Sequence, residues 1–123
     1  KGWFVIVHTG VSDSDLTLSL YEGTAVSAAA LAVTKTCPIW EDLTCTSAST
    51  GYAATTAAYV YTIDTGVAPA RMVIIEWDPA KHTAGYDCIT LADSGGNASN
   101  ICTILFVGQA RYAQAVHVDP LLD

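Results

Sequence analysis

Apolar and polar residues alternate along several short stretches of this chain, a pattern typical of β-strands with one buried face. The clearest example is LTLSLYE at residues 16–22, in which leucines alternate with threonine, serine and tyrosine. Further strands are predicted at 3–8, 58–64, 72–77, 86–91 and 101–108, and residues 31–34 are predicted to be extended. Turn-forming residues separate these stretches, and no stretch shows a sustained helical period.

This rhythm predicts an all-β fold, an antiparallel β-sandwich or jelly-roll-like domain of about seven or eight short strands. The 123 residues fit a single domain spanning 1–123. We expect a C-terminal tail from about residue 109, because no clear period follows the last predicted strand. The sequence opens at Lys1, without methionine, in what reads as a strand, so we expect a further N-terminal segment before it.

Two segments also predict where their strands lie in a sheet. The stretch ICTILFVG at 101–108 is apolar on both faces, which favours a central strand or one covered on both sides. The stretch CPIWEDLTC contains Pro38, which argues against a central strand because proline cannot donate a ladder hydrogen bond.

The composition is apolar for a lone domain and acidic. Hydrophobic residues make up 51% and charged residues only 14%, so part of the apolar surface is expected to cover a partner. The net charge is −7 and the five basic residues are scattered, which argues against a nucleic-acid interface. No apolar run approaches the roughly 18 residues of a membrane helix, so no membrane contact is expected.

Four cysteines are candidates for two disulfides. Cys37 and Cys45 bracket a short loop, and Cys88 and Cys102 lie symmetrically about Gly95 in a predicted hairpin. On neighbouring strands of that hairpin the second pair would be within bridging reach. The alternative is four small buried thiols, and the redox state of the compartment decides between the two.

The segment RMVIIEWDPAKHTAGYDCITL at 71–91 raises the question of an acid/base site. It contains five ionisable groups between its two apolar runs: Glu76, Asp78, Lys81, His82 and Asp87. Catalysis would require these groups to point at one position. The Asp-Pro pair instead favours a turn, and a turn between strands normally exposes its charges to water. We therefore interpret the segment as a solvated corner between two strands.

No other motif indicates catalysis, a metal or a cofactor. The sequence lacks G-x-S-x-G, and His8, His82 and His117 lack the spacing of metal ligands. The tryptophans are more informative, because Trp is enriched both in cores and at interface centres. Trp3, Trp40 and Trp77 are accordingly either core residues or part of a surface that faces a partner.

Residues 59–113 contain, in order, a Tyr-rich strand, MVIIEWDPAKHTAGYDCITL, a Gly/Asn/Ser turn and NICTILFVGQARYAQA. This order resembles a family of small structural proteins of tailed bacteriophages, encoded near the major capsid protein. The matching elements are an apolar strand with an acidic end (73–78), GYDCI (85–89) and RYA (111–113). The stretch CPIWEDLTC has no counterpart in the family pattern.

The resemblance implies a non-enzymatic decoration, cement or minor head protein on the outer surface of a phage capsid. It implies the major capsid protein and further copies of the chain, as a homodimer or homotrimer, as partners. It also implies location in the virion after assembly in the bacterial cytoplasm, with no catalytic residues and no cofactor. The candidate interface residues are Trp3, Trp40, Trp77, Arg111 and Tyr112.

Two other functions compete with this expectation. A carbohydrate- or receptor-binding β-sandwich would use Trp40, Trp77 and the tyrosines as a stacking platform. A small hydrolase would use Asp78 and His82.

Overall fold

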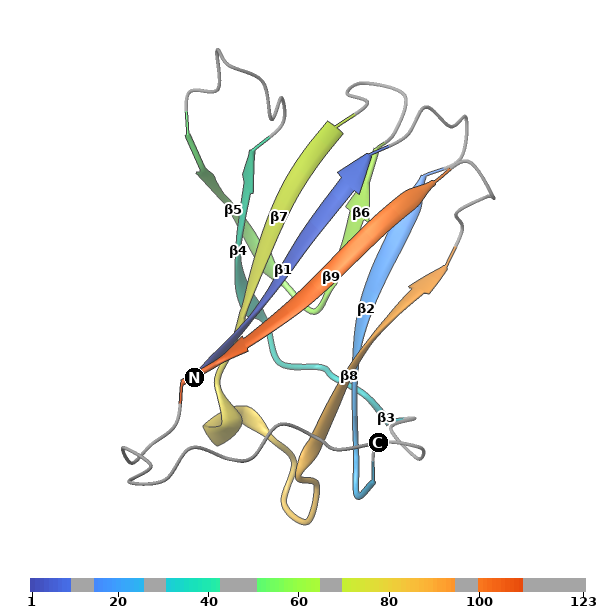
Figure 1. Ribbon diagram of the computed structural model, residues 1–123. Helices are drawn as coiled ribbons and strands as arrows, with labels where there is room; N and C mark the ends of the chain where they lie inside the picture. The colour runs from blue at the N-terminus through green and yellow to red at the C-terminus, as the bar shows by residue number, and fades with distance from the viewer. Residues whose placement is uncertain (10–14, 26–30, 43–50, 65–69, 95–99, 110–123) are drawn as a thin grey trace, which may run out of the picture.

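The alternating stretches of the sequence form strands close to their predicted positions. The computed structural model of the chain describes residues 1–9, 15–25, 31–42, 51–64, 70–94 and 100–109. Nine strands form within these ranges, in two antiparallel sheets that pack face to face (Figure 1). The predicted all-β sandwich is therefore confirmed.

One sheet has five strands in the order β5-β4-β7-β1-β9. Their bounds are β1 Gly2–Thr9, β4 Cys37–Asp42, β5 Ala53–Ala58, β7 Ala70–Trp77 and β9 Ile101–Gly108. All pairings are antiparallel, and β1 is hydrogen-bonded along its full length to β7 on one side and to β9 on the other. Strand β5 was not predicted, because AATTAA lacks alternation, and it forms by pairing with β4.

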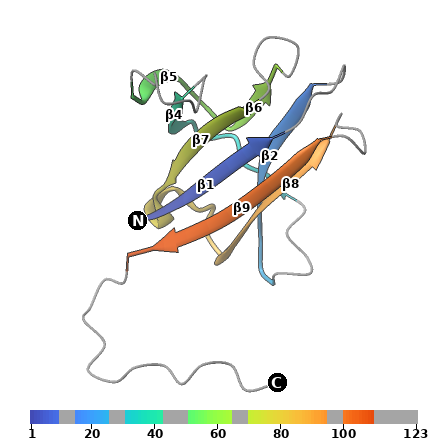
Figure 2. The same ribbon diagram turned by 45° about the horizontal axis from the view of Figure 1, so that its top comes forward.

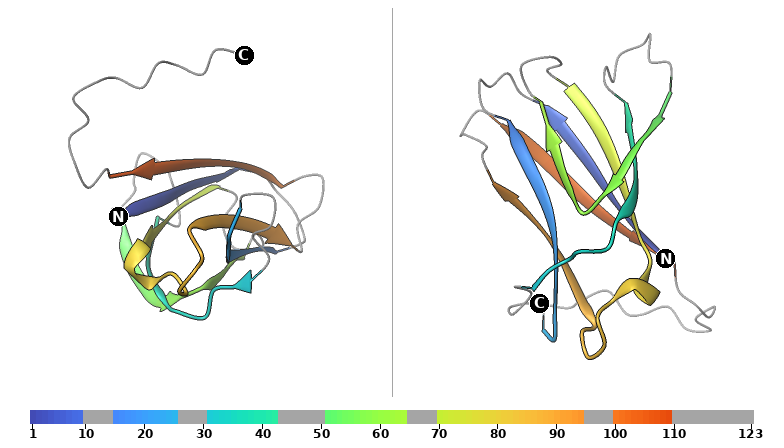
Figure 3. Two further views of the ribbon diagram at one scale, coloured as in Figure 1. Left: turned by 90° about the horizontal axis from the view of Figure 1, so that it is seen from below. Right: turned by 180° about the vertical axis from the view of Figure 1, so that it is seen from behind.

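The second sheet is built around β2 and lies in front of the first in the view from behind (Figure 3, right). Its strands are β2 Leu16–Gly23, β3 Leu31–Ala32, β6 Val60–Ile63 and β8 Cys88–Ser94. Strand β8 runs along one edge of β2, and β6 and then β3 occupy the other edge. A single 3-10 turn, η2 Pro79–Lys81, lies between β7 and β8.

The core lies between the sheets and follows the period-two pattern of the strands. The alternating leucines of β2 are at most 2% exposed, as their spacing predicts. The buried apolar residues are Phe4, Ile6, Leu16, Leu18, Leu20, Val33, Cys37, Ile39, Ile63, Val73, Ile75 and Trp77. Trp77 is only 2% exposed, so its assignment to an interface is wrong. It closes β7 on the inward face and packs in the core.

Strand β4 corrects the prediction made from Pro38. The strand lies between β5 and β7 and is therefore not at an edge. The register with β5 shifts between Cys37 and Ile39, and pairing with β7 begins only at Ile39. The proline thus lies at a bulge, where its missing N–H disrupts no regular ladder.

Strand β9 has its predicted bounds but not its predicted position. It is the last strand of the five-stranded sheet, beside β1 (Figure 2), and both of its faces are exposed. The predicted hairpin with β8 is also wrong, because β8 pairs with β2 in the other sheet. The apolar character of β9 reflects neither a central place nor a cover supplied by the described residues.

The cysteines follow from this topology. Cys88 and Cys102 lie in different sheets and are free thiols, so the candidate bridge between them does not form and the free-thiol alternative holds for this pair. Cys37 is also a free thiol, and burial raises its pKa above the usual value. Cys45 lies outside the described residues, and so does the pairing predicted for it.

Candidate interaction surface

The outer face of the five-stranded sheet carries an apolar row that crosses all five strands. Its members are cross-strand neighbours in the order Ala54, Trp40, Ile74, Val5 and Leu105. They point outward because the residues beside them in the strands face the core. All five are partly or fully exposed, and no described segment crosses the front of this sheet in Figure 1.

The rows on either side extend this apolar surface. One row contains Asp42, Met72, Val7 and Thr103, and the other contains Glu76, Trp3 and Val107. Every residue in them is partly or fully exposed. Together the three rows define what we call the outer face. Trp3 and Trp40, both predicted as interface residues, belong to it.

Glu76 is the one carboxylate in the row of Trp3 and Val107, and it is paired there. The Lys1 ammonium lies 2.6 Å from Oε1, and the Trp3 indole N–H donates to Oε2 at 3.2 Å. The hydrogen bond from Lys1 lowers the pKa of Glu76 below its usual value, against the opposing effect of partial burial. The negative charge of Glu76 is thereby balanced by the positive charge of Lys1.

Strand β9 adds apolar surface on the inward side of the sheet. Ile104 and Phe106 face the same side as the core residues opposite them in β1, yet they are 44% and 51% exposed. The Phe106 ring contacts the Phe4 ring, with 5.0 Å between centroids. It also covers Gly2, where a Cβ would lie 2.5 Å from the ring. Glycine at this position thus permits the close approach of the ring.

The charged corner at 76–87 is only in part the solvated turn that the sequence predicts: Asp87 and residues 83–85 are exposed, whereas Lys81 and His82 are partly buried. Lys81 is half-buried and donates to the Thr36 carbonyl oxygen at 2.6 Å, and the His82 side chain is only 13% exposed. Asp78 accepts a hydrogen bond from the Ala80 N–H at 3.0 Å and so caps the 3-10 turn. The ionisable side chains of the corner do not point at one position: Asp78 caps η2, whereas His82 contacts Glu22 on β2.

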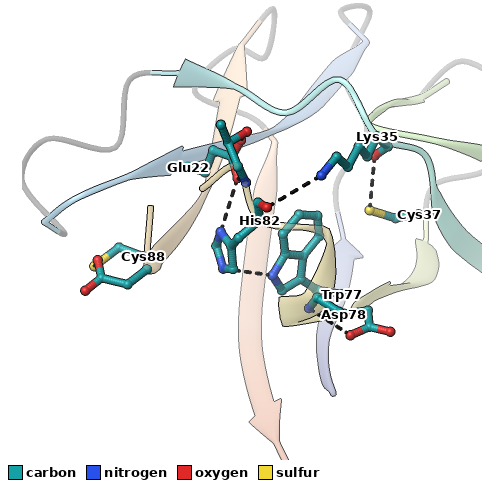
Figure 4. A network of polar contacts seen from close by, with 10 residues as sticks. Glu22, Lys35, Cys37, Trp77, Asp78, His82 and Cys88 are labelled. Carbon is teal, nitrogen blue, oxygen red and sulfur yellow. Dashed lines mark hydrogen bonds and ion pairs between the residues drawn. The ribbon is translucent and has the colours of Figure 1, made fainter. Parts of the chain in front are cut away.

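His82 links the two sheets through a polar network (Figure 4). The Trp77 indole N–H donates to Nε2 of His82 at 3.2 Å, so that nitrogen carries no proton. The other ring nitrogen, Nδ1, lies 3.1 Å from Oε2 of Glu22 and donates to it. The sequence gives no sign of this contact, because Glu22 lies on β2, 60 residues from His82.

Glu22 is a buried carboxylate whose oxygens are all hydrogen-bonded. The Thr83 N–H donates to Oε2 at 3.0 Å, and the Thr83 hydroxyl donates to Oε1. Burial raises the pKa of Glu22, and the hydrogen bonds from Thr83 and His82 lower it. The lowering is the larger effect, so the net pKa is below the usual value. The network holds β2 against the corner that follows β7, and its polar atoms are used in that contact.

A second buried polar group lies at the far end of β1. His8 is fully buried, and Arg71 and Cys102 are its cross-strand neighbours on β7 and β9. Nε2 of His8 lies 3.2 Å from Oδ1 of Asn100. In the sequence His8 is an isolated histidine, since the strand pairing that surrounds it is not visible there.

The described residues contain no group of three His, Cys, Asp or Glu side chains placed to hold a metal ion. Within the same ranges, no helix has the length and apolar character needed to span a bilayer. Arg111 and Tyr112, the remaining predicted interface residues, lie outside the described residues.

Comparison with known proteins finds no matching family model, no significantly similar curated protein and no matching solved structure. The resemblance to phage structural proteins therefore stays a prediction.

Proposed function

We propose that this chain is a non-enzymatic structural protein of a phage virion that binds the outer surface of the capsid through its outer face. The observation that carries the proposal is the apolar row from Ala54 to Leu105, which spans the whole sheet. Apolar surface with aromatic residues near its centre is typical of protein–protein interfaces. The sequence resemblance supplies the phage head as the setting.

The charge distribution supports a protein partner. The chain carries a net charge of −7, which disfavours the side of a capsid that faces DNA. Glu76 is neutralised by Lys1, so binding through the outer face leaves no unpaired charge from this contact buried. The described His, Glu and Asp side chains of the corner serve structural hydrogen bonds, which leaves surface binding as the function that the geometry supports.

Binding of purified chain to phage heads that lack it tests the proposal. The wild type should sediment with the heads in a fixed ratio to the major capsid protein and raise their thermal stability. Ile74→Lys places a charge in the centre of the outer face and should weaken binding by roughly tenfold or more. Ser19→Lys places the same charge on the outward side of the other sheet and is the matched control.

Circular dichroism of both variants must first show the wild-type fold. Equal loss of binding in both variants, or no association of the wild type with heads, would contradict the proposed role.

The carbohydrate-binding alternative loses part of its basis. Trp77 is buried and offers no stacking surface. Trp40 remains on the outer face, and Tyr52, 47% exposed, donates its hydroxyl hydrogen bond to the sulfur of Met72 on the same face. Binding to a glycan array that is abolished by Trp40→Ala, together with no binding to heads, would favour this alternative.

A further inference from the structure

We infer that two copies of the chain pair antiparallel through the free edges of their β9 strands, with Leu105 on the two-fold axis. The pairing would join the two five-stranded sheets into one continuous sheet. This inference does not depend on the capsid role, since it concerns the oligomeric state of the isolated protein.

Among the residues that the structure describes, the free edge of β9 has none of the features that normally prevent strand addition. Within the described part of the chain, β9 pairs only with β1. Its eight residues include no proline and no charged residue, and its register with β1 is continuous without a bulge. Soluble proteins usually protect an edge with one of these features or with a covering segment. An unprotected edge of this length is a template for another strand.

The hydrogen-bonding groups on this edge belong to alternate residues. The Gln109 N–H donates to the Lys1 carbonyl oxygen at 2.8 Å, which fixes the odd-numbered residues of β9 as those bonded to β1. The N–H and C=O groups of Ile104 and Phe106 therefore point away from β1, toward the free edge. These groups are available to a second strand.

Symmetry then selects the register. A two-fold axis normal to the sheet pairs residues that face the same side, so even-numbered residues must oppose even-numbered ones. Axes through Ile104 and through Leu105 overlap equally long parts of β9, residues 101–107 and 102–108. Leu105 on the axis gives more hydrogen-bonded pairs, because Cys102 then pairs with the partner's Gly108 and Ile104 with the partner's Phe106, each pair occurring twice. Ile104 of one copy then exchanges both backbone hydrogen bonds with the partner's Phe106. The two Leu105 side chains meet on the outer face.

The side chains and charges favour a second copy as the occupant. On the inward side, Ile104 packs against the partner's Phe106, and each covers apolar surface that is about half exposed in the single chain. On the outer side, Thr103 opposes the partner's Val107. Each copy carries a charge of −7, but no residue of β9 is charged, so two acidic chains meet here without like-charge contact.

Pairing between β9 strands also closes the assembly. The opposite edge of the sheet is β5, and a β9-to-β5 contact would be head-to-tail and would continue into filaments. A β9-to-β9 contact uses the same edge on both copies and stops at the dimer. It also brings the two outer faces together as one surface for a partner.

Sedimentation equilibrium over a wide concentration range tests the dimer. The wild type should be a reversible dimer, and Ile104→Lys should weaken association at least tenfold, because a lysine then replaces an apolar side chain in the joint. Val60→Lys alters a similarly exposed valine in the other sheet and should dimerise like the wild type. A wild type that stays monomeric, or that grows into filaments, would overturn the inference.

Cross-linking tests the register, in a background that keeps buried Cys37 and replaces the other native cysteines by serine. Leu105→Cys should form an intermolecular disulfide under mild oxidation, because a residue on the axis faces itself in a non-hydrogen-bonded pair. Thr103→Cys alone should not cross-link, whereas the double variant Thr103→Cys/Val107→Cys should. Efficient cross-linking of Thr103→Cys alone, or none by Leu105→Cys, would overturn the register.

Discussion

Buried polar side chains in this protein serve to position its sheets. Glu22, 3% exposed, is the central example, because its oxygens receive hydrogen bonds from two residues of the corner that follows β7. A buried carboxylate is stable in its charged form only when such donors surround it. The net lowering of its pKa means that the folded state favours the ionised form.

Stability should consequently depend on acid pH through Glu22. Its folded pKa lies below the ordinary value of 4.5, so its contribution is complete above about pH 4.5 and is lost as the pH falls through the folded pKa. Urea unfolding should show a decline in this window for the wild type and a smaller one for Glu22→Gln. At neutral pH the variant should be less stable by roughly 1–3 kcal/mol.

Asp93→Asn, which removes an exposed carboxylate of β8, is the control for that comparison. If the free energies of unfolding of the wild type and Glu22→Gln fell in parallel below pH 4.5, the acid sensitivity would arise from groups other than Glu22.

Gly2 and Phe106 should be energetically coupled. A methyl group at Gly2 would overlap the Phe106 ring, so Gly2→Ala should displace the ring and cost about 1 kcal/mol. In a Phe106→Ala background the same substitution should be neutral or slightly stabilising. A double-mutant cycle from thermal unfolding, at concentrations too low for association, measures the coupling. Additive effects would mean that the ring does not occupy this place in solution.

The elements differ in how far the sequence predicts them. Strands with one buried face, such as β2, are predicted well because the leucine alternation directly reports the face that meets the core. The sequence predicts the residues of strand β9 correctly but places it inside a sheet, whereas it lies at an edge. An apolar strand has the same sequence pattern whether its own chain or a partner covers it. Pro38 argued against a central strand, yet β4 lies inside the sheet because a bulge accommodates the proline.

Contacts between distant elements were beyond prediction for a related reason. The Glu22–His82 pair and the separation of β8 from β9 both depend on which sheet each strand joins. Local patterns do not encode that choice, and two strands adjacent in sequence usually pair. Among the predicted interface residues, Trp3 and Trp40 lie on the outer face, whereas Trp77 faces inward with Val73 and Ile75, at the same period-two spacing along β7.

The backbone amides of β9 should report its environment residue by residue. In the monomer, the amides of Leu105 and Val107 bond to β1 and should exchange slowly, whereas those of Ile104 and Phe106 should exchange rapidly. In the dimer all four should be protected. Hydrogen exchange followed by NMR at low and high protein concentration measures this, with Ile104→Lys as a monomeric control. Uniform protection at low concentration would mean that the edge is already covered.

At the scale of the whole molecule, charge is absent from the β9 edge, whereas the outer face includes Asp42 and Glu76. The chain carries a net charge of −7, yet β9 has no charged residue and Glu76, on the outer face, is paired with Lys1. Association through β9 therefore brings two acidic bodies together without charge contacts at the joint. Long-range repulsion between them opposes association, and salt screens such repulsion within about 10 Å at 0.1 M ionic strength.

Raising the ionic strength from low to physiological should accordingly strengthen dimerisation of the wild type. The dissociation constant from sedimentation equilibrium should fall by roughly threefold to tenfold, because screening removes repulsion and disturbs no ion pair at the joint. The disulfide-linked Leu105→Cys dimer should keep a constant mass throughout and so controls for effects of salt on the measurement. Weakening of the dimer by salt would instead indicate ion pairs between the copies, and the two chains would then meet through a charged surface other than β9.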